Sequence, residues 1–196
     1  MKTTSRLASA LLGMALLAPA SAVAITPAAA LPAVSTTTAT CQVVWGSLAK
    51  SDADSHIGDG TVTNLRTGRH TCYDRVVIDI ANIPASKVGY SLAYVNTVRS
   101  IGSGQAIPLD GAAQLKVRVT VPAYNSSGAA TYSPQNQSKV VDVTGYSTLR
   151  QVALAGSFEG QTIFGVGVRA RLPYRVFLLD GPGNGSRLVL DVAHRW

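Results

Sequence analysis

Alternation of apolar and polar residues predicts β-strands along much of this chain, because side chains of a strand point to opposite faces in turn. The cleanest example is residues 114–121, where Leu115, Val117, Val119 and Val121 alternate with polar residues. The other candidate strands are residues 41–48, 73–80, 91–95, 149–155, 162–171, 173–180 and 186–192. No stretch between residues 41 and 196 sustains a helical period. The pattern therefore predicts one all-β domain, an antiparallel sandwich or partly closed barrel of about eight or nine strands.

Residues 70–81 combine a cysteine, an Arg–Asp pair and a strong strand signal. Strand periodicity assigns Arg75, Val77 and Asp79 to one face. The other face, with Val76, Ile78 and Ile80, is expected to form the core. An Arg–aliphatic–Asp pattern recurs at residues 175–180 and 187–192. Because Arg75 and Asp79 lie too far apart on one strand to pair tightly, we expect each to pair with a neighbouring strand, and the repeats supply partners. The leading edge, His70 with Tyr73 and Asp74, is a candidate for ligand contact.

Two connections between the predicted strands are informative. The turn at residues 181–185, Gly-Pro-Gly-Asn-Gly, predicts a hairpin between the last two strands. Residues 122–140 are rich in Ser, Asn, Gln and Gly and predict a long loop. Such loops are often functional or mobile, so docking of this loop on another protein is one hypothesis. Tyr124 and Tyr132 within it are candidates for stacking on a sugar or peptide.

The N-terminus has the order of a secretory signal peptide. Lys2 and Arg6 precede an apolar run at residues 7–17, and small residues end at Ala24. We expect a signal peptide at residues 1–24, a flexible lead-in at 25–40 and the β domain at 41–196. The apolar run is shorter than the roughly 20 residues that span a bilayer, and no later segment is apolar enough, so no transmembrane segment is predicted. The protein is expected to be secreted, extracellular or associated with the cell wall.

Cys41 and Cys72 are the two cysteines of the chain, and in an oxidising compartment a disulfide between them is the default expectation. The chain-entropy model gives about 3.5 kcal/mol of stabilisation for such a loop, as an upper figure. A metal site is the alternative, because His56 and His70 lie in or beside the loop, but the spacings match no structural zinc pattern. Three aspartates at positions 52, 54 and 59 suggest a calcium loop but depart from the EF-hand spacing. No metal and no cofactor are predicted.

The composition adds a modest positive charge. The formal charge of the whole chain is +7, and loss of Lys2 and Arg6 with the signal peptide lowers it to +5. A surplus of this size favours contact with anionic envelope polymers, although it also fits solubility alone. Arg169 and Arg171 share one strand face, where they would grip carboxylates or phosphates, or would form a solvated outer face. Nucleic acid is not an expected partner for an exported chain without an aromatic platform.

Several motifs in order along the chain support a family resemblance. They are His70-x-x-Tyr-Asp-Arg-Val-Val-Ile, the Phe158-Glu-Gly step, the glycines at 165 and 167, Pro173-Tyr-Arg-Val-Phe and Arg187-Leu-Val-Leu-Asp-Val. Together they resemble the AMIN-like domain family of secreted actinobacterial proteins, over about residues 65–192. The resemblance implies an exported β-sandwich-like domain, similar to domains that direct proteins to the envelope through peptidoglycan. Here no catalytic domain accompanies it, so the domain would bind alone or its partner would be another chain.

A catalytic constellation is not evident. The chain has no Gly-x-Ser-x-Gly elbow, and Glu159 is its only glutamate. We therefore expect a non-catalytic envelope-binding domain whose partner is a cell-wall polymer such as peptidoglycan or an envelope protein. The alternatives are a secreted wall-glycan hydrolase that uses Glu159 and a structural module that binds a partner protein. The candidate ligand-binding residues are His70, Tyr73, Asp74, Glu159, Arg169 and Arg171.

Overall fold

The computed structural model describes residues 41–52 and 59–196. The expected signal peptide at 1–24 and lead-in at 25–40 lie outside the described residues, as do His56 and Asp54 of the metal alternatives. These expectations stay predictions. Of the helices in the described part of the chain, none has the length and apolar character needed to cross a membrane.

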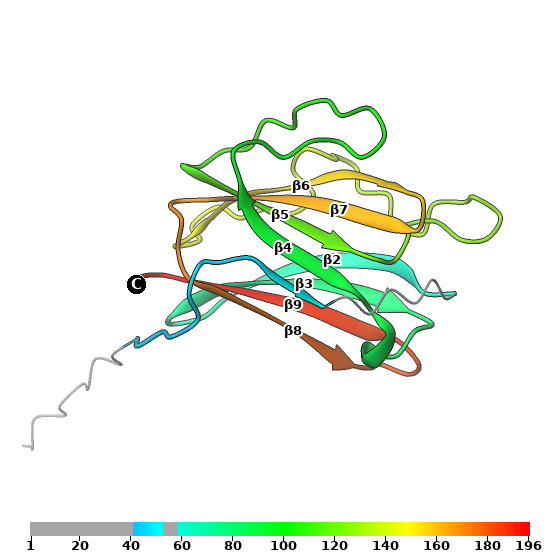
Figure 1. Ribbon diagram of the computed structural model, residues 1–196, viewed down its shortest axis with the longest axis horizontal. Coiled ribbons are helices and arrows are strands. Elements are labelled where there is room, and N and C mark those ends of the chain that lie inside the picture. The colour runs from blue at the N-terminus through cyan, green and yellow to red at the C-terminus, as the bar shows by residue number, and fades with distance from the viewer. Residues whose placement is uncertain (1–40, 53–58) are drawn as a thin grey trace, which may run out of the picture. The chain divides into compact units, whose positions relative to one another are not determined.

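The described strands form two antiparallel sheets that pack face to face as a sandwich (Figure 1). The five-stranded sheet has the order β1-β4-β5-β7-β6, and the four-stranded sheet has the order β2-β3-β9-β8. The strands are β1 (Lys50–Asp52), β2 (Thr61–Arg69), β3 (Tyr73–Ala81), β4 (Tyr90–Val95), β5 (Ala113–Val119), β6 (Leu149–Phe158), β7 (Gln161–Val168), β8 (Tyr174–Asp180) and β9 (Ser186–Ala193). One short 3-10 helix, η1, covers Ala85–Lys87. The predicted β-sandwich is confirmed, and of the two architectures expected it is the one observed.

The core lies between the sheets and follows the alternation in the sequence. Leu115, Val117 and Val119 of β5 are at most 1% exposed and point inward, as predicted. From the other sheet, β3 and β9 contribute alternate aliphatic residues to the same core cluster, including Ile78 and Leu190. The polar residues between them lie on the outer face of the four-stranded sheet. The inner face of the four-stranded sheet therefore packs on the core, and its outer face presents polar side chains that a ligand could contact.

The predicted strand at residues 41–48 is wrong. This segment has no regular strand, and β1 begins only at Lys50. Its aliphatic residues do not enter the core, since Val44 is 97% and Leu48 is 76% exposed. The segment instead lies against β8, where Gly46 accepts a backbone hydrogen bond from Tyr174. The prediction relied on the β-branched and aromatic residues of this segment. Such residues form a strand only where a neighbouring strand pairs with them, and no strand in the described part of the chain pairs with residues 41–48.

Strand β2 is present although the pattern did not predict it. Its inward residues Val62 and Leu65 are three positions apart, because a β-bulge shifts the register between Val62 and Asn64. A bulge inserts one residue and breaks the period of two on which strand prediction depends. β2 pairs with residues 74–81 of β3 and forms an edge of the four-stranded sheet.

Two anchors hold the segment before β1 on the domain. Cys41 and Cys72 form the expected disulfide, with Cα atoms 5.3 Å apart. The fully buried Tyr174 hydroxyl lies 2.8 Å from the Leu48 carbonyl oxygen and 2.9 Å from that of Leu92. Burial raises the pKa of Tyr174 to about 12, so this phenol keeps its proton and its hydrogen bonds at physiological pH. Residues 41–48 are thereby positioned beside β8 and β3.

The loop at residues 122–140 is tied to the sandwich by its own side chains. The Thr131 hydroxyl donates to the Val62 carbonyl at 2.7 Å, and the Tyr132 ring packs against Phe164 with centroids 6.0 Å apart. The Tyr124 hydroxyl accepts a hydrogen bond from the Gly160 amide. Both tyrosines that the sequence offers for stacking therefore contact the protein itself.

Candidate functional site

The outer face of the four-stranded sheet gathers two arginines around one buried carboxylate. The β3–β9 register places Arg75 opposite Asp191, and the β8–β9 register places Arg175 opposite the same residue. Arg75 donates to both carboxylate oxygens at 2.6 and 2.9 Å, and Arg175 donates at 2.8 Å. The cross-strand pairing expected for Arg75 is thus present. Asp79 also pairs across strands, but with Arg66 of β2 rather than with a repeat.

Asp191 holds this triad together from a buried position. The Asp191 side chain is 0% exposed, whereas the Arg75 and Arg175 side chains are 25% and 40% exposed. The hydrogen bonds and charge of Asp191 raise the pKa of Arg75 further above its usual value. Two guanidinium groups and one carboxylate carry one net positive charge. Their pairing positions both guanidinium groups on the face of the sheet.

Aromatic rings surround the two guanidinium groups. The Arg175 guanidinium lies 4.4 Å from the Trp45 ring centroid, and both arginines lie within 6 Å of Tyr73 and Phe177. Tyr73 also contacts Trp45 edge to face at 5.7 Å and stacks on His70 at 4.4 Å. We call this set the arginine–aromatic cluster; it consists of Trp45, His70, Tyr73, Arg75, Arg175, Phe177 and Asp191. All members except Asp191 retain exposed surface.

The cluster offers two kinds of contact to a ligand. Guanidinium nitrogens form charge-assisted hydrogen bonds with carboxylates and phosphates, and the aromatic rings provide flat apolar surface beside them. Because Asp191 and the rings hold both guanidinium groups in place, little conformational entropy is lost on binding. The arrangement suits recognition of an anionic ligand and contains no nucleophile paired with a base.

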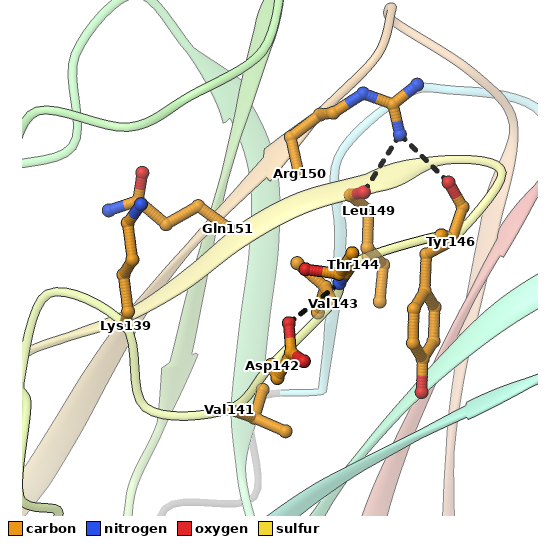
Figure 2. Close-up of a pocket in the computed structure, with 10 residues that line it drawn as sticks. Lys139, Val141, Asp142, Val143, Thr144, Tyr146, Leu149, Arg150 and Gln151 are labelled. Carbon is orange, nitrogen blue, oxygen red and sulfur yellow. Dashed lines mark hydrogen bonds between the residues drawn. The ribbon is translucent and has the colours of Figure 1, made fainter.

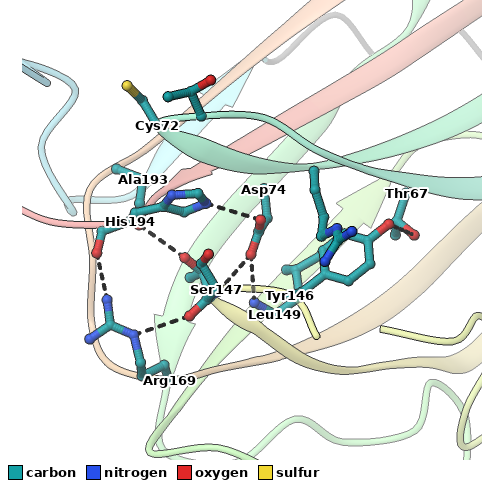
Figure 3. A network of polar contacts seen from close by, with 12 residues as sticks. Thr67, Cys72, Asp74, Tyr146, Ser147, Leu149, Arg169, Ala193 and His194 are labelled. Carbon is teal, nitrogen blue, oxygen red and sulfur yellow. Dashed lines mark hydrogen bonds and ion pairs between the residues drawn. The ribbon is translucent and has the colours of Figure 1, made fainter. Parts of the chain in front are cut away.

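Asp74 lies on the opposite face of β3 from Tyr73, inside the domain (Figure 3). Its carboxylate accepts hydrogen bonds from the amides of Thr148 and Leu149 at 2.5 and 3.2 Å, and lies 3.0 Å from His194 Nε2. Asp74 is fully buried, so these intramolecular contacts occupy it. Ligand contact by Asp74 stays a prediction, and its burial favours a structural role instead.

Arg169 belongs to the same hydrogen-bond network as Asp74 and His194, near the C-terminal end of the chain (Figure 3). Its guanidinium donates to the backbone carbonyls of His194 and Ser147. The Arg171 guanidinium donates to Ser47 and lies 5.3 Å from the Tyr94 ring centroid. Both arginines hold chain segments together, and neither belongs to the arginine–aromatic cluster.

Glu159 lies apart from the other candidates. It occupies the tip of the β6–β7 hairpin with a left-handed φ of 49°, whereas Leu149, at the other end of β6, contacts Asp74. A ten-residue strand spans roughly 30 Å, far beyond the separation of about 5 to 10 Å between glycosidase carboxylates. Of the six candidates, the structure brings only His70 and Tyr73 into the cluster.

Sequence analysis did not identify Trp45, Phe177 or Asp191 as candidate ligand-binding residues. It interpreted Arg75 and Arg175 only as parts of a repeated strand pattern. The Arg-x-Phe spacing in β8 was the available signal, because it puts Arg175 and Phe177 on one strand face. Trp45 carries no such signal, since it reaches the sheet from an irregular segment.

A cavity of about 480 Å³ lies beside the start of β6 (Figure 2). Its Arg150 guanidinium donates to the carbonyls of Tyr146, Ser147 and Leu149. Hydrogen bonds from the Thr144 side chain and backbone lower the pKa of Asp142. Of the described residues, Arg150 is the only arginine that lines this cavity, so the cavity lacks the pair of guanidinium groups that the cluster offers to an anion.

Metal binding finds no support in the described residues. Across residues 41–52 and 59–196, no three His, Cys, Asp or Glu side chains are grouped as metal ligands would be. The sulfurs of Cys41 and Cys72 are bonded to each other, which removes the thiolates that the zinc alternative requires.

Comparison with known proteins gives one match. The family model described as the AMIN-like domain matches residues 60–194, which is more than half of the chain. No curated protein and no solved structure matched. The matched range contains both sheets except β1, and it contains every member of the arginine–aromatic cluster except Trp45.

Proposed function

Because the chain belongs to the AMIN-like domain family, we propose that it is a non-catalytic binding module whose arginine–aromatic cluster contacts an anionic cell-wall polymer. AMIN-like domains are generally non-catalytic, wall-related binding modules. Peptidoglycan, with its acidic peptide groups and sugar rings, is the polymer whose chemistry fits guanidinium groups and aromatic rings together.

The observation that carries the proposal is the pair of arginines fixed by one fully buried carboxylate. A buried ion pair is weak support for stability alone, because desolvation offsets much of its Coulomb energy. Preorganised guanidinium groups instead improve recognition, since they bind planar oxyanions without prior rearrangement. Partial exposure of Arg75 and Arg175 leaves them within reach of a ligand.

The proposed location is extracellular or on the cell wall. The Cys41–Cys72 disulfide is consistent with an oxidising compartment. The signal peptide at residues 1–24 would deliver the chain there and would be removed, leaving the lead-in and the β domain.

Replacing Arg175 by glutamine is expected to weaken retention on purified cell wall by about tenfold at low salt, since a charge-assisted contact is lost. The measurement is co-sedimentation of the protein lacking residues 1–24 with wall material across a concentration series. Arg99→Gln is the matched control, because it removes the same charge from the β4–β5 connection, where Arg99 bonds the Gly104 carbonyl. Retention of this control should match the unmodified protein.

Two outcomes of this experiment would contradict the proposal. The first is no retention of the unmodified protein at low salt. The second is an equal loss for Arg175→Gln and Arg99→Gln, which would indicate attraction by net charge rather than by the cluster.

A further inference from the structure

A second cavity, of about 620 Å³, opens beside the β8–β9 turn. Its lining includes Gly181, Pro182, Asn184 and Gly185 of the turn, together with Asn64, Arg66, Asp79 and Arg187 of the neighbouring strands. The volume falls within the range of small-molecule sites, roughly 300 to 1,000 Å³. Asp79 and Arg187 are opposite each other in the β3–β9 register, on the same outer face as the arginine–aromatic cluster.

The carboxylate in this cavity is already neutralised. Arg66 donates to both oxygens of Asp79 at 3.0 and 3.1 Å, and the Asn64 amide donates to one of them at 3.2 Å. Arg187 stands across the strand from this pair but makes no ion pair within the described chain. The charged lining residues therefore carry one net positive charge, which belongs to Arg187.

Arg187 also has an unused hydrogen-bond donor. One terminal nitrogen donates to the Asp180 carbonyl at 2.9 Å, whereas Nε is buried and has no partner. In the part of the chain that the structure describes, the only other buried side-chain atom without a partner is Oγ of Ser186, the preceding residue of β9. Buried polar groups are almost always hydrogen-bonded, so the unpartnered Nε shows that the described chain does not use all the hydrogen-bond donors of Arg187.

We infer that this cavity binds an oxyanion, a carboxylate or a phosphate, with Arg187 as its anchor. The oxyanion accepts from the guanidinium and balances its charge, while Asp79 remains occupied by Arg66 and does not repel it. Arg75 and Asp79 are four residues apart on β3, or about 13 Å along the strand. A linear acidic polymer of that reach would place one acidic group on the cluster and another in the cavity, and this extension rests on the proposed function.

The test uses small probes and amide chemical shifts of the isotope-labelled protein. N-acetyl-alanyl-alanine supplies a carboxylate, its C-terminal amide is the neutral control, and glycerol phosphate supplies a phosphate. The acid or the phosphate is expected to shift the amides of residues 183–187, and the neutral amide is not. The acidic probe that binds more tightly identifies the source of the oxyanion.

Variants assign the binding to Arg187. Arg187→Gln is expected to weaken the acidic probe by about tenfold or more, and Arg187→Lys, which keeps the charge but has no Nε donor, by less. Arg99→Gln should bind the probe as the unmodified protein does, because Arg99 lies in the β4–β5 connection, outside the cavity. If Arg187→Gln does not fold, Arg187→Lys supplies the test by itself, provided that its well-dispersed spectrum shows that it is folded.

The inference would be overturned if neither acid shifts residues 183–187, if the neutral amide shifts them equally, or if both Arg187 variants bind like the unmodified protein. Its failure can be told from failure of the proposed function. Probe binding without wall retention would leave the cavity site standing and reject the wall function. Wall retention without probe binding would reject the cavity site alone.

Discussion

Asp191→Asn is expected to lower the free energy of unfolding by about 3 to 5 kcal/mol, because it leaves two guanidinium groups beside a neutral amide at a fully buried position. The amide nitrogen of asparagine would also face guanidinium donors rather than accept from them. Arg75 and Arg175 would then repel each other across β9, on which both now converge. Urea denaturation followed by tryptophan fluorescence measures the change.

Asp142→Asn is the control for the Asp191 variant, since Asp142 is an exposed loop carboxylate that accepts a hydrogen bond from the Thr144 amide. We expect this control to change the free energy of unfolding by less than about 1 kcal/mol. If Asp191→Asn lowered the free energy of unfolding by no more than this control does, Asp191 would not be needed to hold the two arginines on the sheet.

Asp74→Ala is expected to destabilise the protein by about 3 kcal/mol. It removes the acceptor of the buried amides of Thr148 and Leu149 and the partner of His194, and an unsatisfied buried donor costs about 1 to 3 kcal/mol. Thermal and urea unfolding would measure this loss. Asp74→Asn keeps one acceptor oxygen and should recover part of it.

Wall retention of the Asp74 variants separates the two roles open to this residue. If Asp74 is structural, as its burial favours, the folded Asp74→Asn protein should bind wall material like the unmodified protein. Loss of retention without loss of stability would instead make Asp74 a ligand contact, as the sequence suggested.

The β-sandwich was accessible from the sequence because local patterns predict it. The inward residues of β5 follow from a strict period of two, and the hairpin turn at residues 181–185 follows from its glycines and proline. β2 was missed because its bulge breaks that period, and residues 41–48 were misassigned because propensity without a partner does not make a strand.

The candidate site was less accessible, because it depends on contacts between distant parts of the chain. Arg75 and Asp191 are 116 residues apart in sequence, and only the strand order β2-β3-β9-β8 makes them neighbours. The repeated Arg–aliphatic–Asp pattern predicted cross-strand pairing but gave no strand order. Trp45 joins the cluster because the segment that carries it is held by the disulfide and by Tyr174.

The most direct test of the central claim is a titration of the labelled protein with solubilised cell-wall fragments, monitored by side-chain and backbone chemical shifts. The account predicts that shifts concentrate on the outer face of the four-stranded sheet, at the Trp45 indole, Tyr73, Arg75, Arg175 and Phe177, and that Arg175→Gln reduces them. Shifts centred instead on the loop at residues 122–140 or on the Glu159 hairpin, with the sheet face unchanged, would contradict it.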